Sequence, residues 1–232
     1  MATKERTLPR HVGFIVDGNR RWAKSHGLPT YEGHLAGYES LKDVLLETLE
    51  HGVEDASAYV FSTENWKRSE KEVSYLMTLL MKVLKDDLHI FAKKNVRLRV
   101  VGSREQLKPK LIQAIENAER QTQDNDGGTL LLCLNYGGQL EIVDAVKTLS
   151  SSGFDMAKLT AEDIQSHLYA PDVPDCDLIV RTSGEQRLSN FMLWRSAYSE
   201  LLFLDKLWPE MTRQDVEYIL DEYARRGRRF GG

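Results

Sequence analysis

The sequence predicts an α/β protein: a single domain with a central, mainly parallel sheet of about six strands, flanked by helices. Short apolar runs alternate with helical patterns along the whole chain, which is the order of elements in β–α–β units. The 232 residues are enough for one sizeable core. No internal repeat or linker is visible, so residues 1–232 are expected to form one domain that ends in a basic tail, residues 225–232.

Each predicted strand is a short apolar run bounded by turn residues. Val12–Val16 lies between Pro9 and Gly18 and is too short for a helix. Thr129–Asn135 is almost continuously apolar, as a central strand of a parallel sheet should be. The other strands are predicted at Ala56–Phe61, Val96–Val101, Asp177–Arg181 and, as a sixth, Leu201–Leu204.

The predicted helices have apolar residues at helical spacing. Gly33–Glu50 has one apolar face and stops at Gly52. Glu70–Lys93 is predicted as one long helix whose apolar arc is wider than the stripe that covers one face of a sheet. Core packing accounts for this arc; alternatively, part of it lines an apolar pocket or tunnel. Further helices are predicted at Arg104–Gln123, Leu140–Leu149, Ala161–Leu168 and Arg213–Ala224, and Ala23–His26 is compatible with a helix.

Composition excludes several classes of function. A net charge of −4 provides no general attraction to nucleic acid or acidic membranes, so anion binding must be local. Cys133 and Cys176 have neither metal-site spacing nor the density of a disulfide framework, which indicates reduced thiols in a cytosolic protein. Met1–Arg10 is too polar for a signal peptide, and no run approaches the ~20 apolar residues of a membrane span. We expect a cytoplasmic protein that could still contact the inner face of a membrane peripherally.

Three predicted strands end in polar clusters. The carboxyl ends of parallel strands meet at one edge of a sheet, so these clusters should converge on one cleft. The clusters are Asp17, Asn19, Arg20, Arg21 and Trp22 after the first strand; Ser62, Glu64, Asn65, Trp66 and Arg68 after the second; and Arg181, Ser183, Glu185, Arg187, Ser189 and Asn190 after the fifth.

The chemistry of these clusters indicates a phosphorylated ligand. Arginines grip phosphate oxygens in bidentate fashion, and Asp17 can hold a hard cation such as Mg²⁺ that bridges to the same phosphates. Several arginines in one cleft of an acidic protein favour a substrate with more than one phosphate. A diphosphate head with a hydrocarbon tail would fit both the cleft and an adjoining apolar pocket.

Three long blocks carry a family resemblance. His11–Trp22 (HVGFIVDGNRRW), Tyr59–Arg68 (YVFSTENWKR) and Arg181–Glu200 (RTSGEQRLSNFMLWRSAYSE) resemble the signature blocks of the cis-prenyltransferases, the undecaprenyl diphosphate synthase family. Asn135–Gly138 and the closing Arg228–Gly232 extend the match over nearly the whole chain. This family extends an allylic diphosphate, commonly farnesyl diphosphate, by repeated condensation with isopentenyl diphosphate, and each step makes a cis double bond.

The resemblance implies a role for each matching residue around the allylic diphosphate. Asp17 resembles the Mg²⁺-associated carboxylate that helps the diphosphate to leave. Asn65 matches the residue usually assigned to proton removal, but an amide is a poor base, so it is expected to position the proton donor and the leaving diphosphate. The implied allylic contacts are Gly18, Asn19, Arg20, Arg21 and His34, with Trp22 as a wall; the second block supplies Ser62, Thr63, Glu64, Trp66 and Arg68.

The resemblance also implies a second substrate site and a partner chain. Glu200 resembles a second metal-associated carboxylate. Arg229 lies in a match to the C-terminal Arg-x-Gly motif, which reaches across a homodimer to the partner's isopentenyl diphosphate. Thr30 stands where relatives often carry an arginine, so one phosphate contact is expected to be missing. The residues expected to hold isopentenyl diphosphate are Arg181, Arg187, Leu188 and Ser189.

Other interpretations make different demands on the sequence. A Mg²⁺-dependent phosphohydrolase with Asp17 as nucleophile would carry a second aspartate where Asn19 stands. A trans-prenyltransferase would carry DDxxD motifs, whereas Asp86–Ile90 lacks the third aspartate and is interpreted as helix surface. A non-catalytic polyprenyl-binding or accessory subunit on the same fold would be expected to lose Asp17 or Asn65, and both are present. Turnover, as opposed to binding alone, distinguishes this last alternative.

The resemblance to this family also suggests the product. We expect a long, undecaprenyl-type polyprenyl carrier for cell-wall glycan assembly. Product length should follow the depth of the apolar pocket, which the sequence does not locate.

Overall fold

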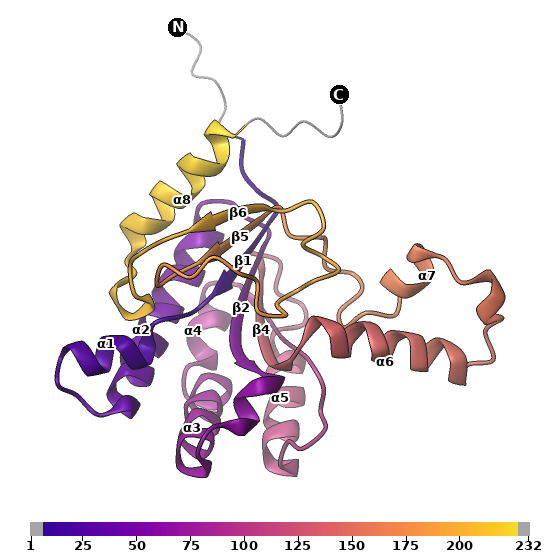
Figure 1. Cartoon of the computed structure of the whole chain (residues 1–232), viewed down its shortest axis with the longest axis horizontal. Coiled ribbons are helices and arrows are strands. Elements are labelled where there is room, and N and C mark those ends of the chain that lie inside the picture. Colours follow the sequence, from indigo (N-terminus) through magenta and orange to yellow (C-terminus); the bar gives the residue numbers. More distant parts are fainter. Residues whose placement is uncertain (1–6, 227–232) are drawn as a thin grey trace, which may run out of the picture.

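The computed structural model describes residues 7–226, which form one six-stranded sheet with helices on both faces (Figure 1). The strands lie in the order β3-β4-β2-β1-β5-β6, and every neighbouring pair is parallel. The predicted single-domain α/β fold is confirmed. The strands are β1 (His11–Ile15), β2 (Asp55–Ser62), β3 (Arg97–Val101), β4 (Thr129–Tyr136), β5 (Leu178–Arg181) and β6 (Glu200–Phe203).

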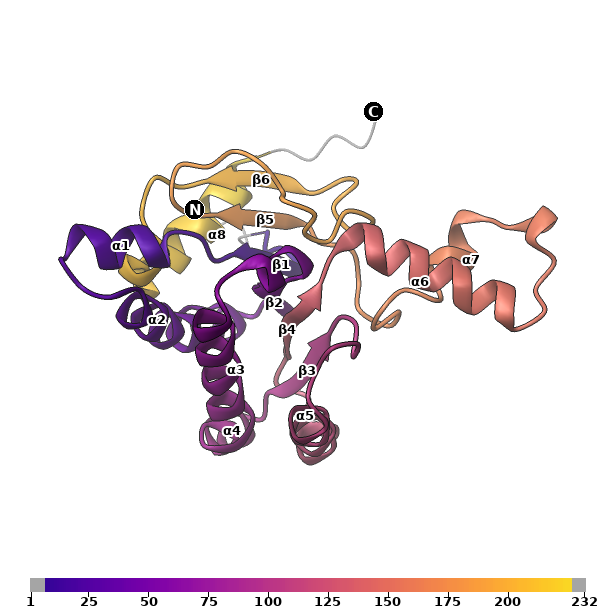
Figure 2. The ribbon, with the colours of Figure 1, turned by 60° about the horizontal axis from the view of Figure 1, so that its bottom comes forward.

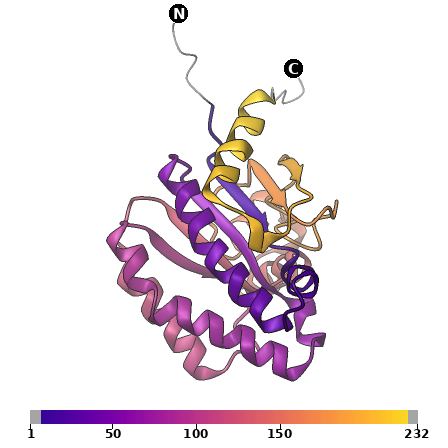
Figure 3. The same cartoon turned by 90° about the vertical axis from the view of Figure 1, so that its left-hand side faces the viewer.

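The helices divide between the two faces of the sheet. In Figure 3, α2 and α8 run across the near face, and Figure 2 shows α3, α4 and α5 continuing along that side while α6 and α7 project from the other. Within residues 7–226, no helix is both long and apolar enough to cross a membrane. The helices are α1 (Asn19–Ser25), α2 (Thr30–Glu50), α3 (Glu70–Lys85), α4 (Leu88–Lys93), α5 (Pro109–Thr122), α6 (Gly138–Ser151), α7 (Ala161–Gln165) and α8 (Arg213–Arg225), with 3₁₀ segments η1 (Thr63–Lys67), η2 (Met156–Lys158) and η3 (Trp208–Glu210).

The core has two apolar clusters, one on each face of the sheet. Because successive side chains of a strand point to opposite faces, Leu130 and Leu132 of β4 belong to the larger cluster, beneath α2, α3, α5 and α8. Leu131 and Cys133 belong to the smaller cluster, together with Phe191 from the loop that follows β5. Cys133 is thus buried in the core with a free thiol, as predicted.

The prediction of one helix over Glu70–Lys93 is wrong. The helix is interrupted between α3 and α4, where the Asp87 amide donates to the Lys82 carbonyl, five residues back, at 3.1 Å. Asp87 was also expected on the helix surface, but only 6% of it is exposed, and its carboxylate lies 3.2 Å from the Lys42 ammonium on α2. The helix breaks where this carboxylate turns inward to pair with a cation.

The helix predicted from Arg104 begins five residues later, at Pro109. The residue before a proline is pushed toward extended backbone, and Lys108 has a ψ of 142°. Pro109 then takes the first helical position, where its missing N–H group costs nothing.

Candidate active site

The carboxyl ends of β1, β2 and β5 bring the three polar clusters together, as predicted. β1 lies between β2 and β5, so Asp17 sits at the centre of this edge. Gly18, with a φ of 117°, turns the chain from the strand into α1. A Cβ atom on Gly33 would lie 2.1 Å from the Asn19 carbonyl oxygen, so α2 can approach the start of α1 this closely only with glycine there.

Asp17 is held between two arginines. One of its oxygens accepts from Arg181 Nη2 at 2.9 Å, and the other lies 3.4 Å from Arg21 Nη2. Burial acts to raise the pKa of the Asp17 carboxyl, but the two guanidinium groups outweigh it, so the pKa lies below its ordinary value. Asp17 is therefore ionised at neutral pH.

Arg181 is the most enclosed cation of the cleft, with only 4% of its surface exposed. Besides Asp17, it donates to Ser189 Oγ at 2.7 Å and to the Arg187 carbonyl at 2.5 Å. Its Nε is buried and has no hydrogen-bond partner among residues 7–226. A buried unused donor on a cation suits an anionic ligand, because an unsatisfied buried polar group otherwise costs about 1–3 kcal/mol.

Two polar cavities meet at Asp17. Their volumes are about 440 and 530 Å³, and both are lined by Val16, Asp17, Tyr59, Asn65 and Arg68. The first cavity adds Gly18, Asn19, Arg20, Arg21, His34, Val60 and Leu76. The second adds Ile15, Ser62, Glu64, Arg181, Ser189 and Asn190.

An apolar cavity of about 60 Å³ lies behind the first polar cavity, between α2 and α3. The two share Val16, Asn19, His34, Val60 and Leu76, so the apolar cavity opens toward the polar cleft. The structure thus supports the second of the two interpretations of the wide apolar arc, since the cavity lies between α3 and α2. Its size is that of a small pocket, and a continuous tunnel is not shown.

The sequence analysis missed Glu72, which joins His34 of α2 to Arg68 of the second polar cluster. Its Oε1 accepts from His34 Nε2 at 3.0 Å and from Arg68 Nη1 at 3.1 Å. Burial opposes ionisation of Glu72, but His34 and Arg68 hold its carboxyl pKa below the ordinary value. Burial lowers the pKa of His34, which Glu72 only partly offsets. The (i, i+4) spacing of Arg68 and Glu72 was the available signal.

The hydrogen bonding of Asn65 supports the interpretation that this residue positions a ligand. Its side-chain oxygen accepts from the Ser62 backbone N–H at 3.1 Å, which caps η1. This bond commits the amide oxygen to the backbone and leaves the NH₂ group as the donor that can face the two cavities.

The structure does not bring every predicted residue into the cleft. The ring of Trp22, expected as a wall, stacks on His26 with centroids 4.3 Å apart. The indole N–H of Trp66 donates to Asn135 Oδ1 at 2.8 Å, which anchors η1 to β4. Neither ring lines the three cavities described above.

Other predicted contacts border the cleft without lining it. The Arg187 side chain pairs with Glu185, while its carbonyl holds Arg181. Leu188 packs against the smaller apolar cluster. Thr63 packs against Gly137: a Cβ atom added to Gly137 would lie 2.8 Å from the Thr63 hydroxyl.

Glu200 lies far from Asp17 within this chain. It is the first residue of β6 and is in register with Leu178, the first residue of β5, so it lies at the amino edge of the sheet. Its carboxylate accepts from Arg226 at 3.1 Å. One chain therefore does not bring these two predicted metal carboxylates together. Arg229 lies outside the described residues.

The Asn135–Gly138 block supports the loop that follows β5. The Gly138 N–H donates to the Asn190 carbonyl at 2.7 Å, and the Asn190 side chain accepts from Gln139 N–H at 2.8 Å. A Cβ atom on Gly138 would lie 2.9 Å from the Leu193 backbone nitrogen. This block thus holds the second cavity's loop in place.

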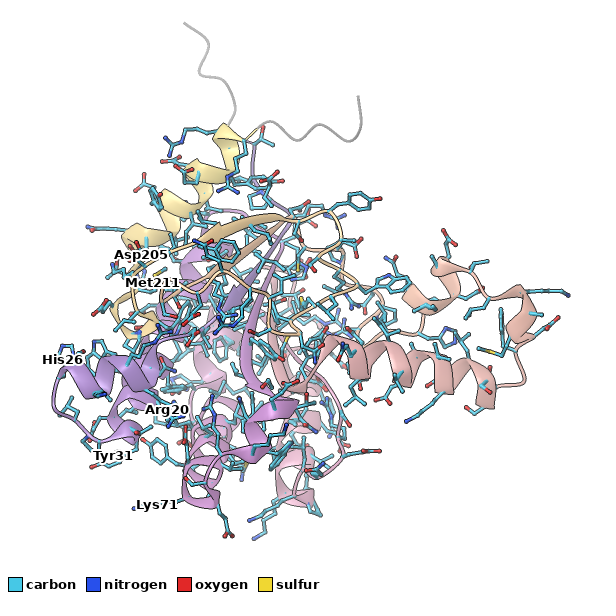
Figure 4. All side chains as sticks on the ribbon, in the orientation of Figure 1. Arg20, His26, Tyr31, Lys71, Asp205 and Met211 are labelled. Carbon is cyan, nitrogen blue, oxygen red and sulfur yellow. The ribbon has the colours of Figure 1, made fainter. Side chains whose placement is uncertain are left out.

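Thr30 lines a separate outer cavity of about 690 Å³ beside the first polar cavity. Arg20, Tyr31 and Lys71 line it as well and are labelled in Figure 4, where they come from α1, α2 and α3. The charge that an arginine at position 30 would supply is absent here.

The donors of the cleft fit Mg²⁺. No group of three or more His, Cys, Asp or Glu side chains within residues 7–226 could form an all-protein metal site. Mg²⁺ is commonly held by one or two carboxylates together with substrate phosphates and water. Asp17, ionised and beside arginines that suit phosphates, matches that donor set.

A parallel α/β sheet whose carboxyl edge gathers arginines around a central carboxylate is typical of a phosphate-binding protein. Comparison with known proteins gives the family: the model described as "Putative undecaprenyl diphosphate synthase" matches residues 15–231. The chain belongs to this family, the cis-type prenyltransferases.

Individual relatives support this family assignment. The chain is 45% identical to an isoprenyl transferase of Thermotoga maritima, covering 97% of each chain. It is 47% identical to the trans,polycis-polyprenyl diphosphate synthase ((2Z,6E)-farnesyl diphosphate specific) of Thermobifida fusca, covering 97% of this chain and 81% of that one. The solved lavandulyl diphosphate synthase of Lavandula x intermedia, in complex with dimethylallyl diphosphate, has a TM-score of 0.92 at 31% identity, covering 97% of this chain and 99% of that one.

Proposed function

We propose that this protein catalyses the Mg²⁺-dependent, repeated condensation of isopentenyl diphosphate with an allylic diphosphate to make a cis-polyprenyl diphosphate. The proposed allylic substrate is farnesyl diphosphate. The observation that carries the proposal is the position of Asp17, where two arginine-bearing cavities meet and an apolar pocket opens from one of them. Two diphosphates can thus lie side by side, with one hydrocarbon tail directed into the apolar pocket.

The allylic diphosphate belongs in the first cavity. Arg20, Arg21 and the backbone around Gly18 and Asn19 line that cavity, and the apolar pocket lies directly behind it. A relative named for farnesyl diphosphate and a solved neighbour that holds dimethylallyl diphosphate support an allylic substrate.

Isopentenyl diphosphate belongs in the second cavity. Arg181 and Ser189 line it, and the free Nε of Arg181 is available to a phosphate oxygen. Because Arg181 also contacts Asp17, the second substrate is held directly beside the leaving group of the first.

The chemistry is a substitution at the first carbon of the allylic chain. The bond from this carbon to the diphosphate oxygen breaks, a new bond forms to C4 of isopentenyl diphosphate, and a proton leaves C2 of the latter to a phosphate oxygen. Arg20 and Arg21 stabilise the charge that develops on the leaving diphosphate. The Asn65 amide donates to the diphosphate oxygen that takes the proton. Mg²⁺, which Asp17 would hold, supplies further charge neutralisation at the leaving group.

We further propose that the enzyme is a cytoplasmic homodimer that contacts a membrane peripherally on product release. Glu200 and its partner Arg226 lie at the edge of the sheet opposite Asp17, so Glu200 can serve a cleft only from a partner chain. The proposed product is the undecaprenyl-type carrier for cell-wall glycans.

An extension assay tests the proposal. Purified protein is incubated with farnesyl diphosphate, labelled isopentenyl diphosphate and Mg²⁺, and the products are resolved by length beside Asp17→Ala and an EDTA control. A Mg²⁺-dependent ladder that the substitution abolishes is the expected result. Folded protein that incorporates no label with farnesyl, geranyl or geranylgeranyl primers would instead be a non-catalytic partner.

A further inference from the structure

The corner where α1 leads into α2 presents apolar side chains to solvent. Every residue from 24 to 31 is exposed. Leu28 keeps 42% and Tyr31 keeps 48% of its surface exposed, and Pro29 lies between them in the chain. Single exposed apolar residues are normal on a protein surface, but a group of them marks a site of interaction. Leu28, Pro29 and Tyr31 form such a group, the apolar corner.

Backbone hydrogen bonds hold the apolar corner in a fixed shape. Gly27 follows α1 with a φ of 66°. The Leu28 N–H donates to the Ala23 carbonyl at 2.8 Å, and the Gly27 N–H donates to the Lys24 carbonyl at 3.2 Å. This pair of bonds is the Schellman motif, in which the residue after the glycine frequently packs back against the last turn of the helix. Leu28 remains exposed instead, so the motif presents an apolar side chain to the outside.

Basic side chains accompany the apolar corner, although the protein as a whole is acidic. Residues 20–31 contain Arg20, Arg21 and Lys24 and no acidic residue, whereas the net charge of the chain is −4. Arg21 pairs with Asp17, but neither Arg20 nor Lys24 forms an ion pair with another of the residues 7–226. At an anionic bilayer, cations interact with the lipid phosphates while apolar side chains enter the acyl boundary. The charge and the apolar side chains of this corner match such a surface.

The outer cavity connects the apolar corner with the substrate cleft. Pro29 and Tyr31 line this cavity together with Lys71 of α3, and Figure 4 shows Tyr31 and Lys71 on the same side of the molecule. Arg20 and His34 line both the outer cavity and the first polar cavity, and His34 also lines the apolar cavity. The apolar corner therefore lies at the outer end of a series of cavities that begins at the apolar pocket.

We propose that the apolar corner, together with Arg20, Lys24 and Lys71, docks on the surface of an anionic lipid bilayer, and that the polyprenyl product passes into the bilayer there. Glu32, in the first turn of α2, follows the corner in the chain and opposes this docking through its charge. The inference rests on the proposed function for the identity of the product, whereas the docking itself requires no turnover.

Co-sedimentation with vesicles is the first test. The full chain is mixed with vesicles of phosphatidylglycerol and phosphatidylcholine, or of phosphatidylcholine alone, at low and at high salt. Wild type should bind the anionic vesicles and should lose most of this binding at high salt. Leu28→Ser combined with Tyr31→Ser should lower the partition coefficient about tenfold, because less apolar surface enters the bilayer. Tyr218→Ser is the matched control, since Tyr218 lies on α8 and is 49% exposed, nearly the same as Tyr31.

Charge variants test the electrostatic part of the proposal. Lys24→Gln and Lys71→Gln should each lower the partition coefficient for anionic vesicles about fivefold, because each removes one cation that faces the lipid phosphates. Glu32→Gln should raise the same coefficient by a similar factor. Lys147→Gln is the control and should leave it unchanged, since Lys147 lies on α6 and its side chain is 72% exposed.

A kinetic measurement links docking to product release. Lys24 and Leu28 line none of the cavities described above, so Lys24→Gln and Leu28→Ser should extend farnesyl diphosphate at the wild-type rate in a single turnover. Anionic vesicles should raise the steady-state rate of wild type, because the product leaves into the bilayer, and this rise should be lost in the two variants.

The outcomes are distinct. Wild type that binds neither kind of vesicle, or binds both equally, overturns docking on an anionic bilayer. Equal binding by wild type and by the Leu28→Ser, Tyr31→Ser protein overturns the assignment of the apolar corner. A change in oligomeric state caused by this double substitution would assign the corner to a second copy of the chain and would also overturn it. Wild type that binds anionic vesicles but incorporates no isopentenyl label overturns the proposed function and supports the docking alone.

Discussion

Replacing Asp17 by asparagine removes one negative charge from the centre of the cleft and almost nothing else. The amide keeps the size of the carboxyl group and can still accept from Arg181, which now donates at 2.9 Å. The backbone of residue 17 stays anchored, because its carbonyl accepts from Thr182 Oγ1 at 2.6 Å. The change therefore tests charge at an intact site.

The structure sets the expected size of the effect. Asp17 would hold the Mg²⁺ that neutralises the leaving diphosphate, and weakening one such electrostatic contribution lowers kcat by about 10²–10³-fold. Stability should change little, because the Asp17 side chain is 32% exposed and such partly exposed pairs contribute about 0–1 kcal/mol. For a chain of this size that corresponds to a Tm shift of at most about 4 °C. Affinity for isopentenyl diphosphate should be unchanged or higher, because Arg181 loses a competing anion.

Initial rates of labelled isopentenyl incorporation, measured across a Mg²⁺ titration, check this prediction. Glu185→Gln is the control, since Glu185 also lies 3.5 Å from Arg21 yet lines neither polar cavity. This control should change kcat by less than about fivefold. If Asp17→Asn kept kcat within tenfold of wild type with the same Mg²⁺ dependence, the assignment of Asp17 would be refuted.

Two further predictions concern stability. Burial lowers the pKa of His11 to about 4, so between about pH 6.5 and 4 the unfolded chain binds a proton that the folded chain does not, and the free energy of unfolding falls by about 3 kcal/mol as the pH is lowered through that window. Urea unfolding should show this pH dependence in wild type and in the exposed control His89→Gln. The same pH dependence in His11→Gln would contradict the prediction. Arg195→Met leaves the fully buried Glu141 carboxylate without its cation, which lies 2.9 Å away, and should lower the free energy of unfolding by about 3–5 kcal/mol in the same measurement. The control Arg99→Met breaks the more exposed pair with Asp172 and should lower it by about 1 kcal/mol or less.

Much of the site was predictable because the fold imposes it. Once a parallel sheet is predicted, residues that follow its strands must share one edge, and Asp17, Asn65 and Arg181 do so. Glu200 was different, because it begins a strand. The same rule places it at the opposite edge, and the register of β6 with β5 confirms that position.

Side-chain partners were not predictable. Trp66 was expected as a substrate contact because it lies in a block that resembles the family, but its N–H donates to Asn135 and ties η1 to β4. Glu72 was not singled out from the sequence, yet it bridges His34 and Arg68. The Trp66–Asn135 and His34–Glu72 pairings join residues far apart in sequence, and the local pattern holds no information on them.

By itself, the sequence determined the order of strands and helices, the α/β class and the family, because periodicity, turn residues and long motif blocks are local properties of the chain. Only the tertiary structure decided where the long helix breaks and which side chains line the apolar cavity. The helix breaks at the junction of α3 and α4, where the buried Asp87 pairs with Lys42 on another helix, and the cavity forms because α2 and α3 pack side by side. Contacts of this kind depend on three-dimensional neighbours, which no stretch of sequence contains.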